Sequence, residues 1–148
     1  MQIGIIGGGP VGSIAGLALK DKGHTVRLFD PSTQKPKMSL ALSETTLSLL
    51  ENIGVHPTAG QDLVEILVTE KGLPGSMLLN AYECGHPRFG RAICSHELDH
   101  ILTEQAAGLV EPSAVTQVRA RTNVGNPRIE LETGETFEPD LVILADGG

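Results

Sequence analysis

The chain has 148 residues, the size of one ordinary globular domain, and 20% of them are charged. Its formal net charge of −7 argues against a broad surface for nucleic acid or anionic membrane. No apolar run approaches the roughly 18 residues that a membrane-spanning helix needs, and the N-terminus lacks the basic start of a signal peptide. We therefore expect a soluble, cytoplasmic protein that forms a single domain over residues 1–148.

The first thirty residues predict a βαβ unit. The apolar run 2–6 is typical of a strand buried on both faces, and Pro10 stands where a helix would begin. The helix is expected to run to about Lys22 and to stop at Gly23. Residues 25–30 then predict a second strand, so the unit has the expected size.

The rest of the chain alternates strands with two shorter helices. Ser43 is the expected N-cap of a helix that ends at Gly54. Its inward-facing residues are expected to be Leu47, Leu49, Leu50 and Ile53. Further expected elements are a hairpin over 64–81, a strand at 90–95, a helix at 96–107, strands within 113–121 and 128–137, and a last strand at 141–145.

Three glycines after the first strand have the spacing of a dinucleotide-binding turn. Gly7 would permit the tight turn, Gly9 would let the backbone approach a pyrophosphate, and Gly12 would let the helix lie close to the sheet. The pyrophosphate would then meet N–H groups at the helix N-terminus, where the helix dipole favours an anion. The alternative is a purely structural connection between strand and helix.

Two aspartates follow strands that are expected in the same sheet. Asp30 ends the second strand, 18 residues after Gly12, where a carboxylate can accept a hydrogen bond from a ribose hydroxyl. Asp146 and Gly147 follow the last strand and are expected at the same crevice. The alternatives are a turn or capping role for Asp30 before Pro31, and an ordinary turn at Asp146.

Four stretches of the chain together resemble the N-terminal part of flavin-dependent aromatic hydroxylases. They are IGIIGGGPVGSIAGLAL (3–19), ALSETTLSLLENIGV (41–55), RAICSHELDHIL (91–102) and IELETGETFEPDLVILADGG (129–148). The resemblance covers essentially the whole chain and is strongest for the 2-polyprenyl-6-methoxyphenol hydroxylases of ubiquinone biosynthesis. The terminal LVILADGG, combined with the glycine turn, is more specific to this class than the turn alone.

The resemblance implies an α/β, Rossmann-like FAD-binding domain, in which antiparallel hairpins are inserted into a parallel sheet with helices. Its cofactor-binding residues would be Gly7, Gly9 and Gly12 at the pyrophosphate, Asp30 at the adenosine ribose, and Asp146 and Gly147 at the flavin side. In such enzymes NAD(P)H reduces the flavin, and O2 is used to hydroxylate an electron-rich ring. The cofactor carries that chemistry, so we assign neither a catalytic residue nor a metal site.

The chain departs from the family's pattern in three respects. Met38 and Ser95 stand where many relatives have arginine. The family also continues beyond the Asp-Gly motif into a substrate-facing sheet. The resemblance therefore implies the cofactor-holding first part of an enzyme, inactive alone, whose complete form acts on an aromatic small molecule. If a sheet edge or substrate-facing surface is left uncovered by the missing part, we expect self-association.

Two other motifs have less support. HELDH (96–100) has the spacing of a zinc-peptidase helix, but no histidine follows His100 to supply a third ligand. The run from Cys94 to His96 suggests a nucleophile and a base, a geometry that sequence neighbours rarely achieve. Cys84 and Cys94 are expected to be buried or unreactive thiols.

Two rival functions stay open from the sequence. One is a non-catalytic dinucleotide-binding module. The other is an NAD(P)-dependent oxidoreductase domain, which the glycine turn and Asp30 favour but the hairpins and terminal motif do not.

Overall fold

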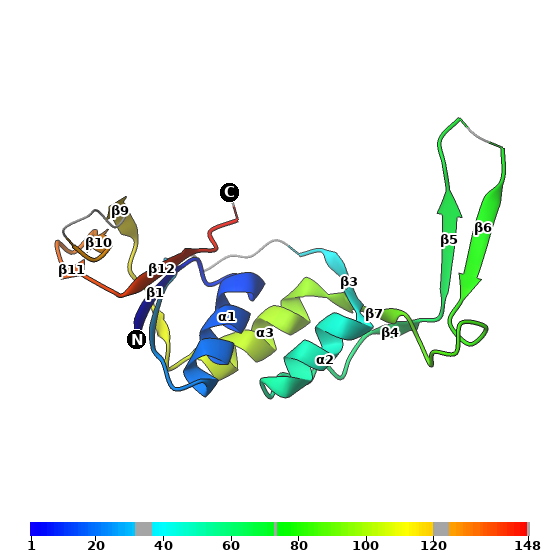
Figure 1. Ribbon diagram of the computed structural model, residues 1–148, viewed down its shortest axis with the longest axis horizontal. Helices are drawn as coiled ribbons and strands as arrows, with labels where there is room; N and C mark the ends of the chain where they lie inside the picture. Colours follow the sequence, from blue (N-terminus) through cyan, green and yellow to red (C-terminus); the bar gives the residue numbers. More distant parts are fainter. Residues whose placement is uncertain (32–36, 73, 120–124, 148) are drawn as a thin grey trace. The chain divides into compact units, whose positions relative to one another are not determined.

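The computed structural model describes residues 1–31, 37–72, 74–119 and 125–147. The chain divides into two compact units, whose helices and strands are labelled in Figure 1. Unit 1 comprises Met1–Pro36 and Asp99–Gly148, and unit 2 comprises Lys37–Leu98. Helix α3 (Ser95–Ala106) contains the boundary between them.

Unit 1 is built on a four-stranded sheet in the order β12-β1-β2-β8, with every neighbouring pair parallel. The strands are β1 (Gln2–Ile6), β2 (Thr25–Phe29), β8 (Val110–Glu111) and β12 (Leu141–Leu144). Helix α1 (Pro10–Asp21) connects β1 to β2 and packs against both strands. The chain crosses from β1 to β2 on one side and returns to β12 on the other, which places a topological switch point at β1.

Both faces of β1 are covered, as its unbroken apolar run predicts. On one face Ile3 and Ile5 join Val26 and Leu28 of β2 in a core on which α1 packs. On the other face Gly4 takes the place of a side chain, because a Cβ there would lie 2.5 Å from Ile129 Cδ1. The near-absence of polar residues in β1 thus follows from two covering layers.

The second covering layer is a three-stranded antiparallel sheet in the order β11-β10-β9. It consists of β9 (Val115–Arg119), β10 (Arg128–Leu131) and β11 (Thr136–Phe137). Arg27 of β2 lies 4.7 Å from the Phe137 ring centroid and bonds both carboxylate oxygens of Glu111 at 2.5 and 2.6 Å. The Glu111 bonds lie within the parallel sheet, whereas the Phe137 contact and a bond from Arg27 to Glu135 at 2.9 Å join that sheet to its cover. The hydrogen bonds to Glu111 and Glu135 raise the pKa of Arg27 above its ordinary value.

Unit 2 holds a second antiparallel sheet in the order β3-β7-β4, and a separate hairpin (Figure 1). Its elements are β3 (Ser39–Ser43), α2 (Glu44–Asn52), β4 (Gln61–Leu63), β5 (Glu65–Thr69), β6 (Ser76–Asn80) and β7 (Gly90–Cys94). The Ser43 hydroxyl accepts a hydrogen bond from the Thr46 N–H at 3.2 Å, which confirms the predicted N-cap of α2. Among the described strands, β5 and β6 pair only with each other.

The structure confirms the predicted fold class, an α/β fold with a parallel sheet and antiparallel insertions. It corrects the prediction for Leu49, which is 49% exposed while Leu47 and Leu50 are buried. Cys84 and Cys94 are exposed, so they are not buried thiols. Strands β3, β4 and β8 were not predicted. Residues 120 and 121 of the expected strand at 113–121 lie outside the described residues, and the single-domain expectation stays a prediction.

Candidate functional site

The glycine turn connects β1 to α1, and two of its glycines are required by the protein itself. Gly7 has φ of 102°, and an added Cβ would lie 2.7 Å from the Asp146 amide nitrogen. A Cβ on Gly12 would overlap the carbonyl oxygen of Gly7. Gly7 and Gly12 therefore allow the turn to close on itself and on the end of β12.

Gly9 is different, because an added Cβ would meet no atom of the described residues within 4 Å. It is the N-cap of α1, with an extended backbone at φ −65° and ψ 179°, a conformation open to any residue. Pro10 follows at the first helical position, and the first turn of α1 carries no acidic side chain. The N–H groups of Val11 and Gly12 precede the first helical bond, from Ser13 to Gly9, and so have no partner inside the helix. The turn therefore offers hydrogen-bond donors beside open space.

Gly8 and Ser13 are two residues of this turn that sequence reasoning missed. A Cβ on Gly8 would lie 2.5 Å from Asp30 Oδ2, so the absence of a side chain at Gly8 makes room for that carboxylate. The buried Ser13 hydroxyl donates to the Gly8 carbonyl oxygen at 3.1 Å. The run of three consecutive glycines could have indicated that Gly8 is part of the turn. Nothing in the sequence indicated the role of Ser13.

The parallel sheet brings the predicted residues to one edge. The Gly7 N–H donates to the Phe29 carbonyl at 2.9 Å, and the Ala145 N–H donates to the Ile6 carbonyl at 2.7 Å. These bonds set the ends of β2 and β12 on either side of the end of β1. Gly7 therefore lies beside Asp146, and the half-buried Asp30 lies beside Gly8.

The assembled groups suit a dinucleotide. Backbone N–H groups at the start of α1 can bind a pyrophosphate without any basic side chain. The Asp30 carboxylate can accept hydrogen bonds from a ribose, and the exposed Asp146, next to Gly147 at φ 77°, offers a second acceptor at the far side of the turn. The open space at Gly9 provides the close approach that the backbone needs. These residues fit FAD, with its two polyol groups on either side of one pyrophosphate.

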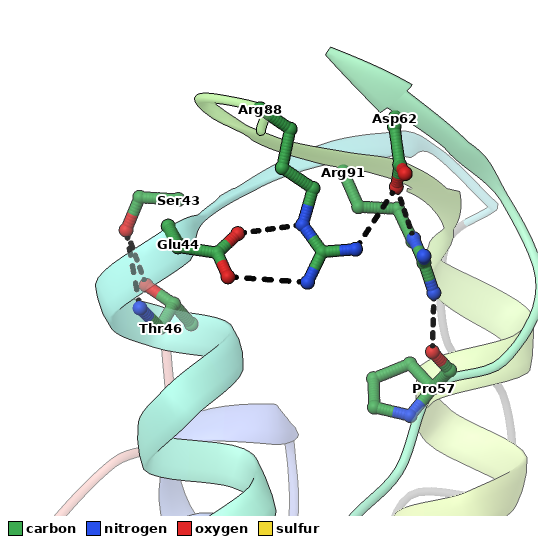
Figure 2. A network of polar contacts seen from close by, with 7 residues as sticks. All are labelled: Ser43, Glu44, Thr46, Pro57, Asp62, Arg88 and Arg91. Carbon is green, nitrogen blue, oxygen red and sulfur yellow. Dashed lines mark hydrogen bonds and ion pairs between the residues drawn. The ribbon is translucent and has the colours of Figure 1, made fainter. Parts of the chain in front are cut away.

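A second polar cluster lies in unit 2, and Figure 2 shows it (Ser43, Glu44, Thr46, Pro57, Asp62, Arg88 and Arg91). Arg88 bonds both carboxylate oxygens of Glu44 at 2.6 and 3.1 Å and reaches Asp62 at 3.3 Å. Arg91 bonds the same Asp62 at 2.8 Å and the Pro57 carbonyl at 3.0 Å. The network ties the start of α2 to β4 and β7, so we assign it a structural role.

This network predicts an acid-sensitive fold. Hydrogen bonds from Arg88 and Arg91 hold the pKa of Glu44 and of Asp62 below their ordinary values. Their stabilising effect is complete above the unfolded-state pKa of about 4 and is lost as the pH falls through the lowered folded-state values. We expect the urea concentration at the unfolding midpoint to decrease as the pH is lowered below about 4. The decrease should be less steep in Glu44→Gln. Glu51→Gln, at the other end of α2, is the control, and equal slopes in all three proteins would refute the assignment.

The remaining motifs do not assemble into sites in the described part of the chain. His96 and His100 are exposed on α3, and His100 Nδ1 lies 3.7 Å from Glu104 Oε2 on the same helix. Across residues 1–31, 37–72, 74–119 and 125–147, no group of three His, Cys, Asp or Glu side chains lies close enough to hold a metal ion. Ser95, between Cys94 and His96, is 4% exposed and turned toward Met38.

Met38 and Ser95, which depart from the arginines of the resembled family, contact each other. The Ser95 hydroxyl accepts from the Met38 N–H at 3.0 Å, and the Ser95 N–H donates to the Met38 carbonyl at 2.8 Å. This reciprocal pair fixes the segment before β3 to the start of α3. The Met38 atoms in this pair belong to the backbone, so the Ser95 hydroxyl is the side-chain group that contributes to it.

Comparison with known proteins agrees with this geometry. Hispidin-3-hydroxylase of Neonothopanus nambi is 27% identical over 99% of this chain. The structure resembles 2-methyl-3-hydroxypyridine-5-carboxylic acid oxygenase, with a TM-score of 0.74 and 25% identity over 99% of the chain. It also resembles Klebsiella pneumoniae HpxO complexed with FAD and uric acid, with a TM-score of 0.76 and 18% identity over 99% of the chain.

The chain spans only part of the length of these relatives, namely 37% of the curated hydroxylase and 39% of each of the two solved chains. No helix in the described residues is long and apolar enough to span a membrane. The family model described as FAD binding domain matches residues 1–148, the full length of the chain. The chain therefore belongs to this family of FAD-binding domains, and FAD is its cofactor.

Proposed function

We propose that this chain is the FAD-binding part of a flavin-dependent monooxygenase that hydroxylates an aromatic compound, using NAD(P)H and O2. The proposal depends on one observation: the glycine turn, Asp30 and Asp146 lie together at one edge of the parallel sheet. The similarity to a hydroxylase and to an oxygenase supports the class of reaction. A polyprenyl-phenol precursor of a quinone is the proposed substrate, on the sequence resemblance alone. A cytoplasmic location also stays a prediction.

The residues of this chain would bind and orient the cofactor. We assign the pyrophosphate to the turn of Gly7, Gly9 and Gly12, and the adenosine ribose to Asp30. We assign the flavin side to Asp146 and Gly147. FAD supplies the redox chemistry when bound, so we assign no catalytic side chain in this part. The wall of the aromatic pocket would come from polypeptide beyond these 148 residues, and we expect no hydroxylation by the chain alone.

The alternatives are an NAD(P)-dependent oxidoreductase domain and a module that binds a dinucleotide without catalysis. Both would use the same glycine turn and Asp30. The antiparallel insertions and the Asp-Gly end of β12 favour the flavin enzyme over the first alternative. Hydroxylation of a phenol by a longer form of the protein would exclude the second.

The test is a calorimetric titration of the chain with FAD and, separately, with NADH. We expect saturable FAD binding and much weaker binding of NADH. Asp30→Ala should weaken FAD binding by roughly tenfold to a hundredfold, the range expected for losing a hydrogen bond to a charged group. Asp21→Ala, which removes an exposed carboxylate at the other end of α1, is the control. A preference for NADH would support the dehydrogenase alternative.

We further propose that the exposed hairpin causes the chain to self-associate. Its register puts Ile66 beside Leu79 and Val68 beside Met77 on one face, and Val68 and Met77 are 44% and 54% exposed. A two-stranded hairpin is marginal alone, and packing this apolar face against the same face of a second copy would bury both. Light scattering should show a dimer at micromolar concentration, and Val68→Lys should dissociate it. Thr69→Lys should not, because Thr69 lies beside Ser76 on the opposite face, the face that carries Leu67 and Leu78. A monomer at every concentration would count against the proposal.

A further inference from the structure

Ser13 holds the glycine turn by two successive carbonyl groups. Its hydroxyl donates to the Gly8 carbonyl oxygen at 3.1 Å, and its backbone N–H donates to the Gly9 carbonyl oxygen at 3.0 Å. The residue is only 2% exposed, so water does not compete well for either bond. One residue in the first turn of α1 thus fixes two consecutive peptide groups.

The first of these bonds sets the direction of an N–H group. The peptide between Gly8 and Gly9 is planar and trans, so its N–H points opposite to its carbonyl. Because Ser13 binds the Gly8 carbonyl, the Gly9 N–H points away from Ser13. Two adjacent glycines would otherwise let this peptide rotate at little energetic penalty.

Gly9 is also the residue whose Cα borders open space. We propose that Ser13 is a positioning residue for FAD, which aims the Gly9 N–H at the pyrophosphate by holding the Gly8 carbonyl. The inference rests on the proposed pyrophosphate site at this turn. The Ser13 hydroxyl makes this bond to the Gly8 carbonyl, and a small apolar residue at the same position could not make it.

The test compares Ser13→Ala and the size-matched Ser13→Cys, whose thiol is a weak donor, with the wild-type chain. The control is Thr116→Val, which removes another hydroxyl-to-carbonyl bond of 3.1 Å, from Thr116 to Glu130 in the antiparallel sheet. Dissociation constants for FAD and for ADP are measured by calorimetry. The Gly9 amide signal of the ligand-free chain is recorded by ¹⁵N NMR, and the unfolding midpoint by urea titration.

Both Ser13 variants should bind FAD and ADP more weakly by the same factor, roughly twofold to tenfold for one neutral hydrogen bond. Their Gly9 amide signal should shift or broaden, and Thr116→Val should change neither property. If both Ser13 variants bound FAD with wild-type affinity and kept an unchanged Gly9 signal, the positioning role of Ser13 would be refuted. The proposed pyrophosphate site would still stand. If the wild-type chain binds neither FAD nor ADP, or if Gly9→Val binds them equally well, the proposed site itself fails and the inference fails with it.

Discussion

Replacement of Gly9 by valine is expected to weaken FAD binding by roughly a hundredfold or more, which corresponds to about 2.8 kcal/mol. The ligand-free fold should tolerate the change, because in the part of the chain that the structure describes an added Cβ at this position meets no atom within 4 Å. The extended backbone of Gly9 also precedes Pro10, a setting that suits a β-branched residue. We therefore expect the free energy of unfolding to fall by no more than about 1 kcal/mol, the effect of a poorer N-cap.

This prediction separates a ligand-facing glycine from a structural one. Calorimetry with FAD gives the affinity, and urea unfolding of the ligand-free chain gives the stability. Val11→Ala is the matched control, since the Val11 side chain is 72% exposed on the same turn of helix and carries no proposed role. If Gly9→Val bound FAD as tightly as the wild type, the pyrophosphate would have to lie elsewhere.

Gly12→Ala should have the opposite profile and destabilise the fold itself by more than about 3 kcal/mol. Its Cβ would overlap the Gly7 carbonyl oxygen, a backbone atom that cannot move aside as a flexible side chain can. Gly7 is in turn confined by the end of β12. The overlap would have to be relieved by moving α1 away from the sheet, which would open the core around Ile5.

The same helix supplies the control for this prediction. Gly16 is buried, but an added Cβ would lie 3.5 Å from Leu109 Cδ1 and 3.6 Å from Ile5 Cδ1, which is ordinary contact. Alanine is also the better helix former, so Gly16→Ala should change the stability by less than about 1 kcal/mol. Urea unfolding followed by circular dichroism measures both variants. Equal stabilities for the two would mean that the turn is looser than the structure shows.

Local signals in the sequence were sufficient to predict the βαβ unit. Pro10 at the first helical position and Gly23 after the last marked both ends of α1, and the apolar run of β1 required cover on both faces. The glycine spacing then located the turn. Asp30 followed from its distance along the chain, because the end of a parallel strand next to β1 lies at the same edge as the turn.

The features that were missed depend on contacts between distant residues. Strand β8 has only two residues and exists because Leu28 and Phe29 pair with it. The need for glycine at position 8 comes from the Asp30 carboxylate, 22 residues further along the chain. Leu49 has a spacing that fits an inward face, yet it lies on the exposed side of α2 beyond the sector that Leu47 and Leu50 bury. Periodicity alone does not determine where the edge of a buried face lies.

The most direct test of the cofactor site is a map of backbone amide shifts on titration with FAD, recorded by ¹H–¹⁵N NMR. The assembled edge of the sheet predicts the largest shifts at Gly9, Gly12 and Asp30, with a second group at Asp146 and Gly147. Residues of the β5–β6 hairpin should keep their ligand-free positions. Saturable FAD binding that shifts the hairpin and leaves the glycine turn unchanged would contradict the account.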